Sequence, residues 1–124
     1  MPVAPKLGSS STREQINAML GGGVQAFSPT RNGHVVCGCF KLDLNPDAPE
    51  VVLVGVGPQR ERSAEIAVLQ KTPFPVFLKR DVDEWEYVGD YLAVRYLDRG
   101  HKLLEAEERA KRKDVAGILY MERA

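Results

Sequence analysis

The stretch that decides the fold is Pro73–Tyr96, which reads PFPVFLKRDVDEWEYVGDYLAVRY. A short apolar run, Val76–Leu78, precedes the acidic turn Asp81–Glu84, and a second run of alternating residues begins at Trp85. Aromatic and β-branched residues that alternate with period two between turn-forming residues are typical of β-strands. The link between the two runs is too short for a crossover, so the strands must pair antiparallel. We expect this hairpin to form the sheet on which the rest of the chain packs.

The region before the hairpin begins with a predicted helix and a predicted strand. The pattern S/T-x-x-E at Ser11–Glu14 predicts a capped helix start, and the glycine run at 21–23 predicts the helix end. The alternation over His34–Leu44 predicts a strand with Cys37 and Cys39 on one face and Phe40 on the other. Val35 should then share the face of the two cysteines.

A second strand and a second helix are expected between that strand and the hairpin. Val51–Val54 is almost wholly apolar, which favours a short strand at the centre of the sheet. The following helix is expected over about Gln59–Lys71, with Ile66 and Leu69 on its buried side.

After the hairpin the composition predicts a charged helix at Lys102–Lys113 and a last strand at Ile118–Met121. Acid-first ion pairs four residues apart are expected along this helix: Glu105–Arg109, Glu107–Lys111 and Glu108–Arg112. We therefore predict an α+β fold: a single domain with a twisted, mostly antiparallel, partly closed β-sheet and about three flanking helices. Residues 1–10, rich in proline, glycine and serine, are expected to be a flexible tail, with the domain at 11–124.

The composition is that of an ordinary globular domain of 124 residues with no net charge, since 17 Lys and Arg balance 17 Asp and Glu. Zero net charge argues against nonspecific coating of nucleic acid, although it allows a local basic patch. No apolar run approaches the roughly 20 residues of a membrane helix, and the N-terminus has no apolar signal core. We expect a cytoplasmic protein with reduced thiols and no membrane contact.

Metal-site patterns in the sequence are incomplete. His34 should point away from Cys37 and Cys39 on a strand, and structural zinc requires four ligands, so we interpret the thiols as core residues. The stretch that starts at Asp43 resembles the beginning of a calcium-binding loop. It lacks the glycine and the glutamate that such a loop requires at positions 6 and 12. The sequence implies no cofactor.

A second candidate site is the glycine pair Gly55 and Gly57, which follows a strand and precedes a helix. Backbone amides and the helix dipole can bind an anion there, and Arg60 and Arg62 would add positive charge. The third glycine of a dinucleotide site and the Lys-Ser/Thr pair of a P-loop are both absent. This pattern favours a DNA phosphate over a small nucleotide, and an enzyme acting on a nucleotide remains an alternative. No nucleophile elbow or other catalytic set is present, so we expect a non-catalytic protein.

Several short stretches occur in an order that is typical of one family. They are Arg13–Ile16 with Leu20–Gln25, Arg31–Asn32, Leu53–Gly57, Pro75–Leu78 with Trp85–Val94, and Gly117–Arg123. Together they resemble the bacterial SRA-type domains (SET- and RING-associated, PUA-like), which are found fused to HNH nucleases and bind modified cytosine. The resemblance covers most of the chain from Arg13 onward and implies a PUA-like barrel.

The resemblance implies a sheet that grips DNA, with one base flipped out of the stack into a pocket between aromatic rings. Phe40 would supply one ring and Asp43 would accept a hydrogen bond from the cytosine amino group, while Leu53 stands where the family has a tyrosine. The residues expected to contact the nucleic-acid backbone are Arg31, Asn32, Gly57, Gln59, Arg60 and Arg62.

Two functions follow as expectations. The first is a non-catalytic DNA-binding domain that reads modified cytosine by base flipping and is associated with restriction or with DNA-damage responses. Since the chain carries no nuclease motif, any cleavage would need a nuclease or other protein partner. The second is a protein-interaction module on the same fold with a decayed base pocket, in which Lys102–Lys113 and exposed aromatic residues would contact another protein.

Overall fold

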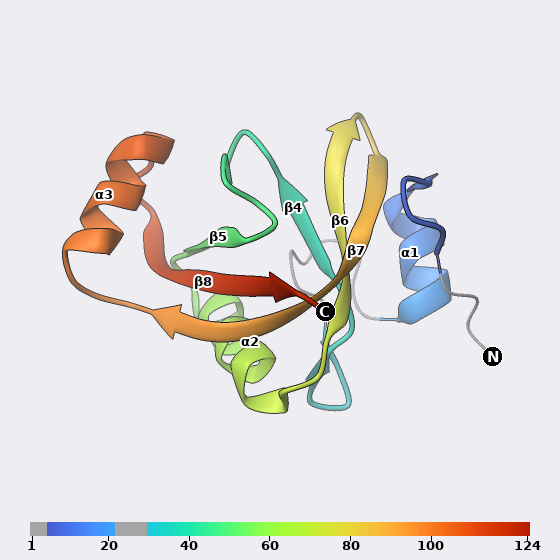
Figure 1. Ribbon diagram of the computed structural model, residues 1–124, viewed down its shortest axis with the longest axis horizontal. Helices are drawn as coiled ribbons and strands as arrows, with labels where there is room; N and C mark the ends of the chain where they lie inside the picture. Colours follow the sequence, from blue (N-terminus) through green and yellow to red (C-terminus); the bar gives the residue numbers. More distant parts are fainter. Residues whose placement is uncertain (1–4, 22–29) are drawn as a thin grey trace.

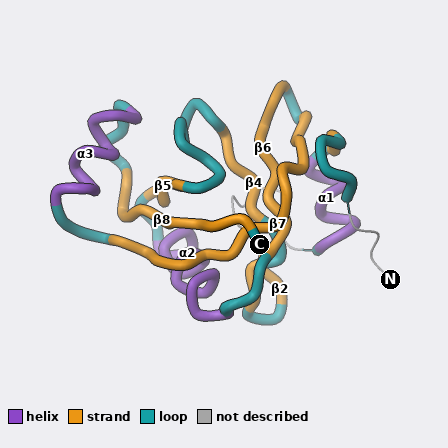
Figure 2. Tube along the Cα trace, viewed as in Figure 1, coloured by secondary structure: helices purple, strands orange, loops and turns teal. Residues whose placement is uncertain are grey.

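Three helices surround a mixed β-sheet in the computed structural model, which describes residues 5–21 and 30–124 (Figure 2). In chain order the elements are β1 (Ser10–Ser11), α1 (Arg13–Leu20), β2 (Thr30–Arg31), β3 (His34–Val35), β4 (Gly38–Lys41), β5 (Val51–Gly55), α2 (Pro58–Gln70), β6 (Phe74–Asp81), β7 (Glu84–Leu97), α3 (His101–Ala110) and β8 (Val115–Arg123). The fold class is therefore α+β with three helices in the described part of the chain, as predicted.

The hairpin expected at the centre of the fold is present. β6 and β7 pair antiparallel, with Asp81 opposite Glu84 across the turn. The main sheet has the strand order β4-β6-β7-β8-β5, with β1 paired to β7, and among the described strands only β4 and β6 run parallel. Within the described residues the ladder does not return from β5 to β4, so the hydrogen-bonded sheet is open and does not close as the barrel that was expected.

β5 lies at the edge of the sheet, so its predicted central position is wrong. Its apolar composition has another cause, because both of its faces are covered. Val52 and Val54 belong to the main core, while Leu53 packs on the opposite side with Val115 and residues of α3.

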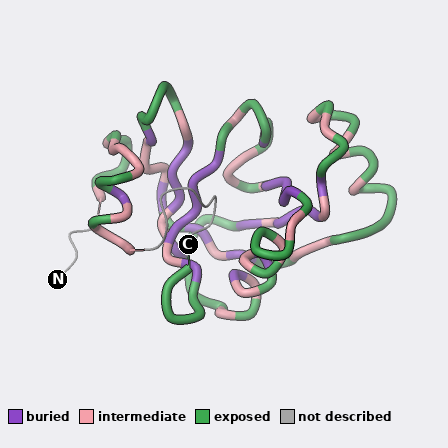
Figure 3. Tube along the Cα trace, turned by 180° about the vertical axis from the view of Figure 1, so that it is seen from behind, coloured by how far each residue is buried: buried purple, intermediate pink, exposed green. Residues whose placement is uncertain are grey.

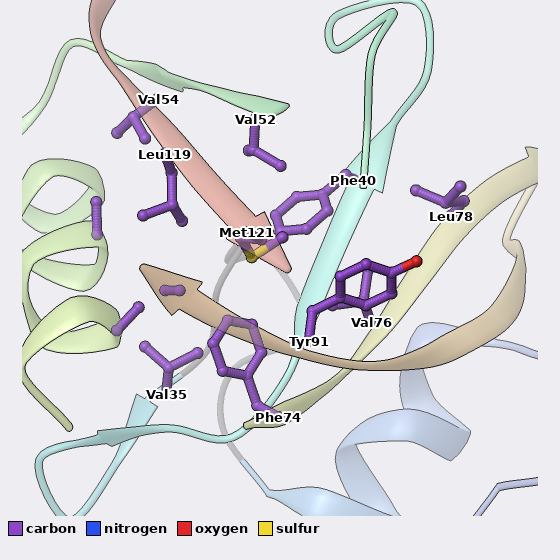
Figure 4. Close-up of a cluster of buried hydrophobic side chains, with 13 residues drawn as sticks. Val35, Phe40, Val52, Val54, Phe74, Val76, Leu78, Tyr91, Leu119 and Met121 are labelled. Carbon is purple, nitrogen blue, oxygen red and sulfur yellow. The ribbon is translucent and has the colours of Figure 1, made fainter. Parts of the chain in front are cut away.

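The helices occupy three different places around the sheet (Figure 1). α1 and α3 lie at opposite ends of the molecule, and α2 packs against the sheet between them. Figure 4 shows that Phe40 from β4 and Val52 from β5 both point into the main core, although these are the two edge strands of the ladder. The sheet is thus curved enough for its edges to share one core. Buried positions follow the central strands, whereas the turns and α3 are largely exposed (Figure 3).

α1 begins one residue later than the sequence pattern suggested. Thr12, not Ser11, is the N-cap: its hydroxyl accepts a hydrogen bond from the Gln15 backbone N–H, and the Gln15 side chain accepts one from the Thr12 backbone N–H. This is a complete capping box with glutamine in place of glutamate. The helix ends at Leu20 with Gly21 as its C-cap, and the remainder of the glycine run with Gln25 lies outside the described residues.

The expected strand over His34–Leu44 is split into β3 and β4. The break changes the phase of the alternation, so Val35 lies in the main core with Phe40, not with the cysteines as expected. Cys37 and Cys39 are buried together in a second cluster against α1. The hydrogen bond of Cys37 to Cys39 and its burial both raise the pKa of Cys37, which is consistent with a core thiol.

β7 changes face in a similar way. Trp85 and Tyr87 pack towards α1, whereas Tyr91 and Ala93 belong to the main core. The register between β6 and β7 shifts next to Gly89, which has a φ of 123°. One extra residue at a bulge exchanges the two faces of a strand, so a single long strand serves two cores.

The buried side of α2 consists of small residues. Ala64 and Ala67 are buried and Ile66 is partly buried, but Leu69 is 76% exposed, which contradicts its predicted place in the core. With about 3.6 residues per turn, Leu69 lies far round the helix from the face that Ala64 and Ala67 bury, so it points towards solvent.

α3 is shorter than predicted, and this changes its ion pairs. It ends at Ala110, and Lys111 adopts a left-handed conformation. Lys111 and Arg112 therefore lie beyond the helix, where i,i+4 geometry does not apply. Arg112 bonds to Asp114, and Arg109 bonds to Asp47, in place of the expected intrahelical partners.

Part of the stretch expected to be a tail contacts the sheet. The Gly8 N–H donates to the Tyr87 carbonyl, the Tyr87 N–H donates to the Ser9 carbonyl, and β1 continues this pairing. Residues 1–4 lie outside the described part. Among the described helices none has the length and apolarity needed to cross a membrane.

Candidate nucleic-acid interface

A cleft of about 630 Å³ opens where several distant segments meet. Its walls come from the start of α1, the end of β4 with the loop that follows, the end of β5, the start of α2, the turn between β6 and β7, and the segment between α3 and β8. The β4–β5 loop and the β6–β7 turn extend to the same side of the sheet (Figure 1). We call this cavity the loop cleft.

The lining of the loop cleft is more basic than the chain as a whole. The basic side chains are Arg13, Lys41, Arg60, Lys79 and Arg112, and the acidic ones are Glu14, Asp83 and Asp114. Five cations against three anions leave an excess of two positive charges, although the complete chain has none. A net positive lining favours an anionic ligand over a cationic one.

The apolar floor of the cleft includes Phe40 and Leu53. Phe40 is only 1% exposed, and its ring points into the main core near Val52 and Met121 (Figure 4). A Cβ atom at Gly38 would lie 2.5 Å from Cζ of this ring, so the glycine provides the space that the ring occupies. In this arrangement Phe40 closes the floor and does not present a ring face for stacking.

Asn45, which is 6% exposed, lies on the buried side of the β4–β5 loop and anchors the cleft wall that this loop forms. Its Nδ2 donates to the Lys41 carbonyl at 3.1 Å, and its Oδ1 accepts from the Leu53 N–H at 2.8 Å. The Leu53 N–H is buried, and a buried polar group without a partner is costly. Asn45 therefore links the loop to β5 directly under the cleft.

Two arginines, Arg109 in the last turn of α3 and Arg112 just after the helix, bind the same loop. The Arg112 guanidinium donates to both carboxylate oxygens of Asp114 and to the Leu44 carbonyl, and its side chain is 11% exposed. Arg109 makes two hydrogen bonds to Asp47, at 2.7 and 2.8 Å. These bonds lower the pKa of Asp114 and of Asp47 below their ordinary values. The loop wall is therefore preorganised by charge-assisted bonds.

The opposite wall contains Trp85, which is 5% exposed. The Arg13 guanidinium carbon lies 5.2 Å from the centroid of the indole, and the Lys79 ammonium lies 5.9 Å from it. Both distances are in the range of cation–π interactions. The indole N–H is buried and has no hydrogen-bond partner within the described residues.

The start of α2 differs from the predicted phosphate cradle. The Gly57 N–H donates to Oε2 of Glu61 at 3.1 Å, so a carboxylate of the helix itself binds where an anion was expected. Arg60 donates to the Val56 carbonyl and lines the cleft beside Gly55. A Cβ at Gly55 would lie 3.4 Å from Arg60 and 3.5 Å from Arg112, so the glycine lets both arginines approach β5.

Of the residues predicted for the interface, Phe40 and Arg60 line the loop cleft. The other six do not belong to its lining: Arg31, Asn32, Asp43, Gly57, Gln59 and Arg62. Arg31 and Asn32 lie on the β2–β3 hairpin, which Figure 2 places on the opposite side of the sheet from the β6–β7 turn. Asp43 is exposed in the β4–β5 loop, and Gln59 and Arg62 are exposed on the first turn of α2.

Sequence reasoning missed most of the cleft as a site. Arg13, Lys79 and Arg112 come from three distant segments and belong to no shared spacing pattern. Trp85 was noticeable as the only tryptophan of the chain. Its position beside Arg13 depends on the packing of α1 against β7, which no local pattern reveals.

The comparisons with known proteins bear on the fold. No protein-family model and no curated protein matches the sequence. Among solved structures, the SUVH5 SRA domain in complex with hemi-methylated CG DNA is similar over 100% of this chain and 93% of that chain, with a TM-score of 0.64 and 13% identity. The SUVH5 SRA domain bound to fully hydroxymethylated CG DNA matches over the same shares, with a TM-score of 0.62 and 13% identity. The sequence motifs predicted this architecture correctly: the chain has the SRA-type fold.

Proposed function

We propose that this protein is a non-catalytic DNA-binding domain that reads modified cytosine. The observation that carries the proposal is the basic loop cleft, located on a fold similar to SRA domains that were solved with methylated and hydroxymethylated CG DNA. Phosphate contacts dominate the affinity of proteins for DNA. A local excess of cations in a chain with zero net charge therefore supports the loop cleft as the surface that would face the duplex.

The finer part of the proposal is that a flipped base enters the loop cleft. Enzymes and readers that need access to a single base take it out of the stack, and a pocket then recognises its edge and faces. A cleft of about 630 Å³ has room for one nucleotide. Its walls are held in place by Asn45 and Arg112, so the pocket exists before DNA arrives and does not have to be built by binding.

The proposal also assigns contacts to the predicted residues outside the lining. Gln59 and Arg62 on the first turn of α2 flank the cleft residue Arg60 and would contact phosphates next to the flipped nucleotide. Asp43, exposed on the loop wall, would accept a hydrogen bond from the amino group of a cytosine at the cleft entrance. Arg31 and Asn32, on the β2–β3 hairpin at the opposite side of the sheet from the β6–β7 turn, receive no contact with this duplex in the proposal.

Fluorescence anisotropy with short labelled duplexes tests this function. Unmodified, methylated and hydroxymethylated CG duplexes are compared at ~50 mM and ~200 mM salt, because phosphate contacts release counterions and make binding salt-dependent. We expect binding that weakens steeply with salt and is tighter for one modified duplex. Salt-dependent binding without preference would leave a plain DNA-binding domain and remove the reader.

A pair of arginine variants makes the test specific to the cleft. Arg60→Ala removes a cation from the lining and should weaken binding and lower the salt dependence by about one phosphate contact. Arg99→Ala is the control, because that side chain is 89% exposed and lies outside the lining. Equal losses for both variants, or no binding at either salt, would contradict the cleft as the DNA site. Absence of binding would favour the protein-interaction module.

A further inference from the structure

We propose that the face of the β7–β8 pair that points away from α2 is a self-association surface, which binds a second copy of this chain. The surface consists of Leu92 and Arg95 on β7 with Tyr120 and Glu122 on β8, and we call it the β7–β8 face. None of these four residues lines the loop cleft. The inference therefore goes beyond the proposed function and does not depend on it.

The pairing register places the four side chains on one face of the sheet. Leu92 lies opposite Glu122, and Arg95 lies opposite Tyr120. Residues that lie directly opposite each other in an antiparallel pair share a face, and successive residues of a strand alternate between the faces. Met121, between Tyr120 and Glu122, belongs to the main core, which includes the buried alanines of α2. The β7–β8 face is therefore the face opposite to that core.

The β7–β8 face lies open between two helices. α3 packs on a cluster at the start of β8, and α1 packs on the cluster around Trp85 at the start of β7. These two helices lie at opposite ends of the molecule (Figure 1), which leaves the stretch between them open. Arg95 and Glu122 are accordingly exposed, and Val94 next to Arg95 is 41% exposed.

A partner can bind this face only through side chains. β7 and β8 each have a strand on both sides in the sheet, so neither offers a free edge for another strand. The Arg95 guanidinium carbon lies 4.9 Å from the centroid of the Tyr120 ring, and this cation–π contact holds the charge in place. Tyrosine and arginine are enriched among the residues that contribute most to protein–protein binding.

The charges of the face match those of a second copy. Neither Arg95 nor Glu122 has an ion-pair partner within residues 5–21 and 30–124. The two charges lie on one diagonal of the four-residue surface, and Leu92 and Tyr120 lie on the other. A two-fold axis along the Leu92–Tyr120 diagonal puts apolar groups on their own copies and Arg95 opposite Glu122 of the partner subunit, twice. A partner of one charge sign would leave one of the two charges facing its like, so the second copy is the better occupant.

Sedimentation equilibrium of the wild-type chain without DNA tests the self-association. We expect the average mass to rise from the 13.7 kDa of one chain towards that of two chains. The rise should fall between about 10 and 500 μM, because an interface of few side chains gives a weak dimer. A mass of one chain throughout the series would overturn the proposal.

Charge reversals test whether the dimer uses this face. Arg95→Glu and Glu122→Arg each place like charges opposite one another, so each should raise the dimer Kd more than about ten-fold. An equimolar mixture of the two variants should form a dimer again, because each reversed charge then meets its opposite. Lys71→Glu is the matched control: it reverses an exposed charge at the end of α2, on the other side of the sheet, and should leave the Kd unchanged.

Two results would exclude the β7–β8 face as the contact: a dimer that both single reversals leave intact, or a mixture of the reversed chains that stays monomeric. Circular dichroism checks that each variant is folded, and the wild-type masses decide the self-association even if a variant does not fold. Since no DNA is present, a failure here leaves the DNA-binding function untouched.

Discussion

Replacing Asn45 with alanine tests whether the loop wall is fastened in the way the structure indicates. The change leaves the Leu53 N–H buried without its acceptor, which lies at 2.8 Å in the wild type. The Lys41 carbonyl keeps two other donors, the backbone N–H groups of Leu44 and Asn45, at 3.2 and 2.9 Å. The cost is therefore dominated by one orphaned buried donor, about 1–3 kcal/mol of unfolding free energy.

Urea unfolding followed by circular dichroism measures this loss, and hydrogen exchange of the Leu53 amide locates it. Asp43→Ala is the matched control, since Asp43 is in the same loop but exposed; an exposed site of this kind should change stability by less than about 0.5 kcal/mol. A loss below about 0.5 kcal/mol for Asn45→Ala, or slow exchange of the Leu53 amide in that variant, would refute the reasoning.

Three further predictions concern the hydrophobic core and the loss of stability at acidic pH. Gly38→Ala should lower the free energy of unfolding by about 1–3 kcal/mol through overpacking, because the new Cβ would lie 2.5 Å from Phe40 Cζ. Adding Phe40→Leu should recover part of that loss in the double variant. An unchanged urea midpoint for Gly38→Ala would contradict this prediction. Ile16→Ala, at a site 1% exposed, should lower the free energy of unfolding by about 2–5 kcal/mol, whereas Leu69→Ala, at a site 76% exposed, should lower it by less than about 0.5 kcal/mol. Thermal unfolding of the two variants side by side checks this ranking, and similar losses would show that the buried face of α2 is wrongly assigned. The bonds from Arg112 lower the folded pKa of Asp114, so this carboxylate stabilises the fold above its unfolded pKa of about 3.9 and the stabilisation is lost as the pH falls through the lower folded pKa. Arg112→Ala should therefore flatten the decline of the unfolding free energy between about pH 5 and 2, measured by urea titration at each pH. An unaltered slope would exclude this ion pair as a cause of the decline.

Elements with a strong local signal were predictable from the sequence. The β6–β7 hairpin was identified because its alternation and its acidic turn are properties of neighbouring residues. The three helices were found from periodicity and capping, with end points displaced by one to three residues. The order of the short motifs also predicted the SRA-type fold, which the similarity to SRA structures confirms.

Strand faces were less predictable, because bulges and breaks alter the phase of the alternation. The break after Val35 moved this residue to the main core, and the bulge at Gly89 divided β7 between two clusters. Such shifts are set by the pairing of one strand with another, and a strand read by itself does not contain them.

The sequence by itself determined the fold class, the central hairpin and the family resemblance, since these depend on residues that are close along the chain. Only the tertiary structure decided the candidate site. Arg13, Lys79, Trp85 and Arg112 are brought to one cleft by the packing of α1 and α3 at opposite ends of the sheet. The physical reason is that electric fields and hydrogen bonds act through space over a few ångströms, whereas sequence patterns record only neighbours along the chain.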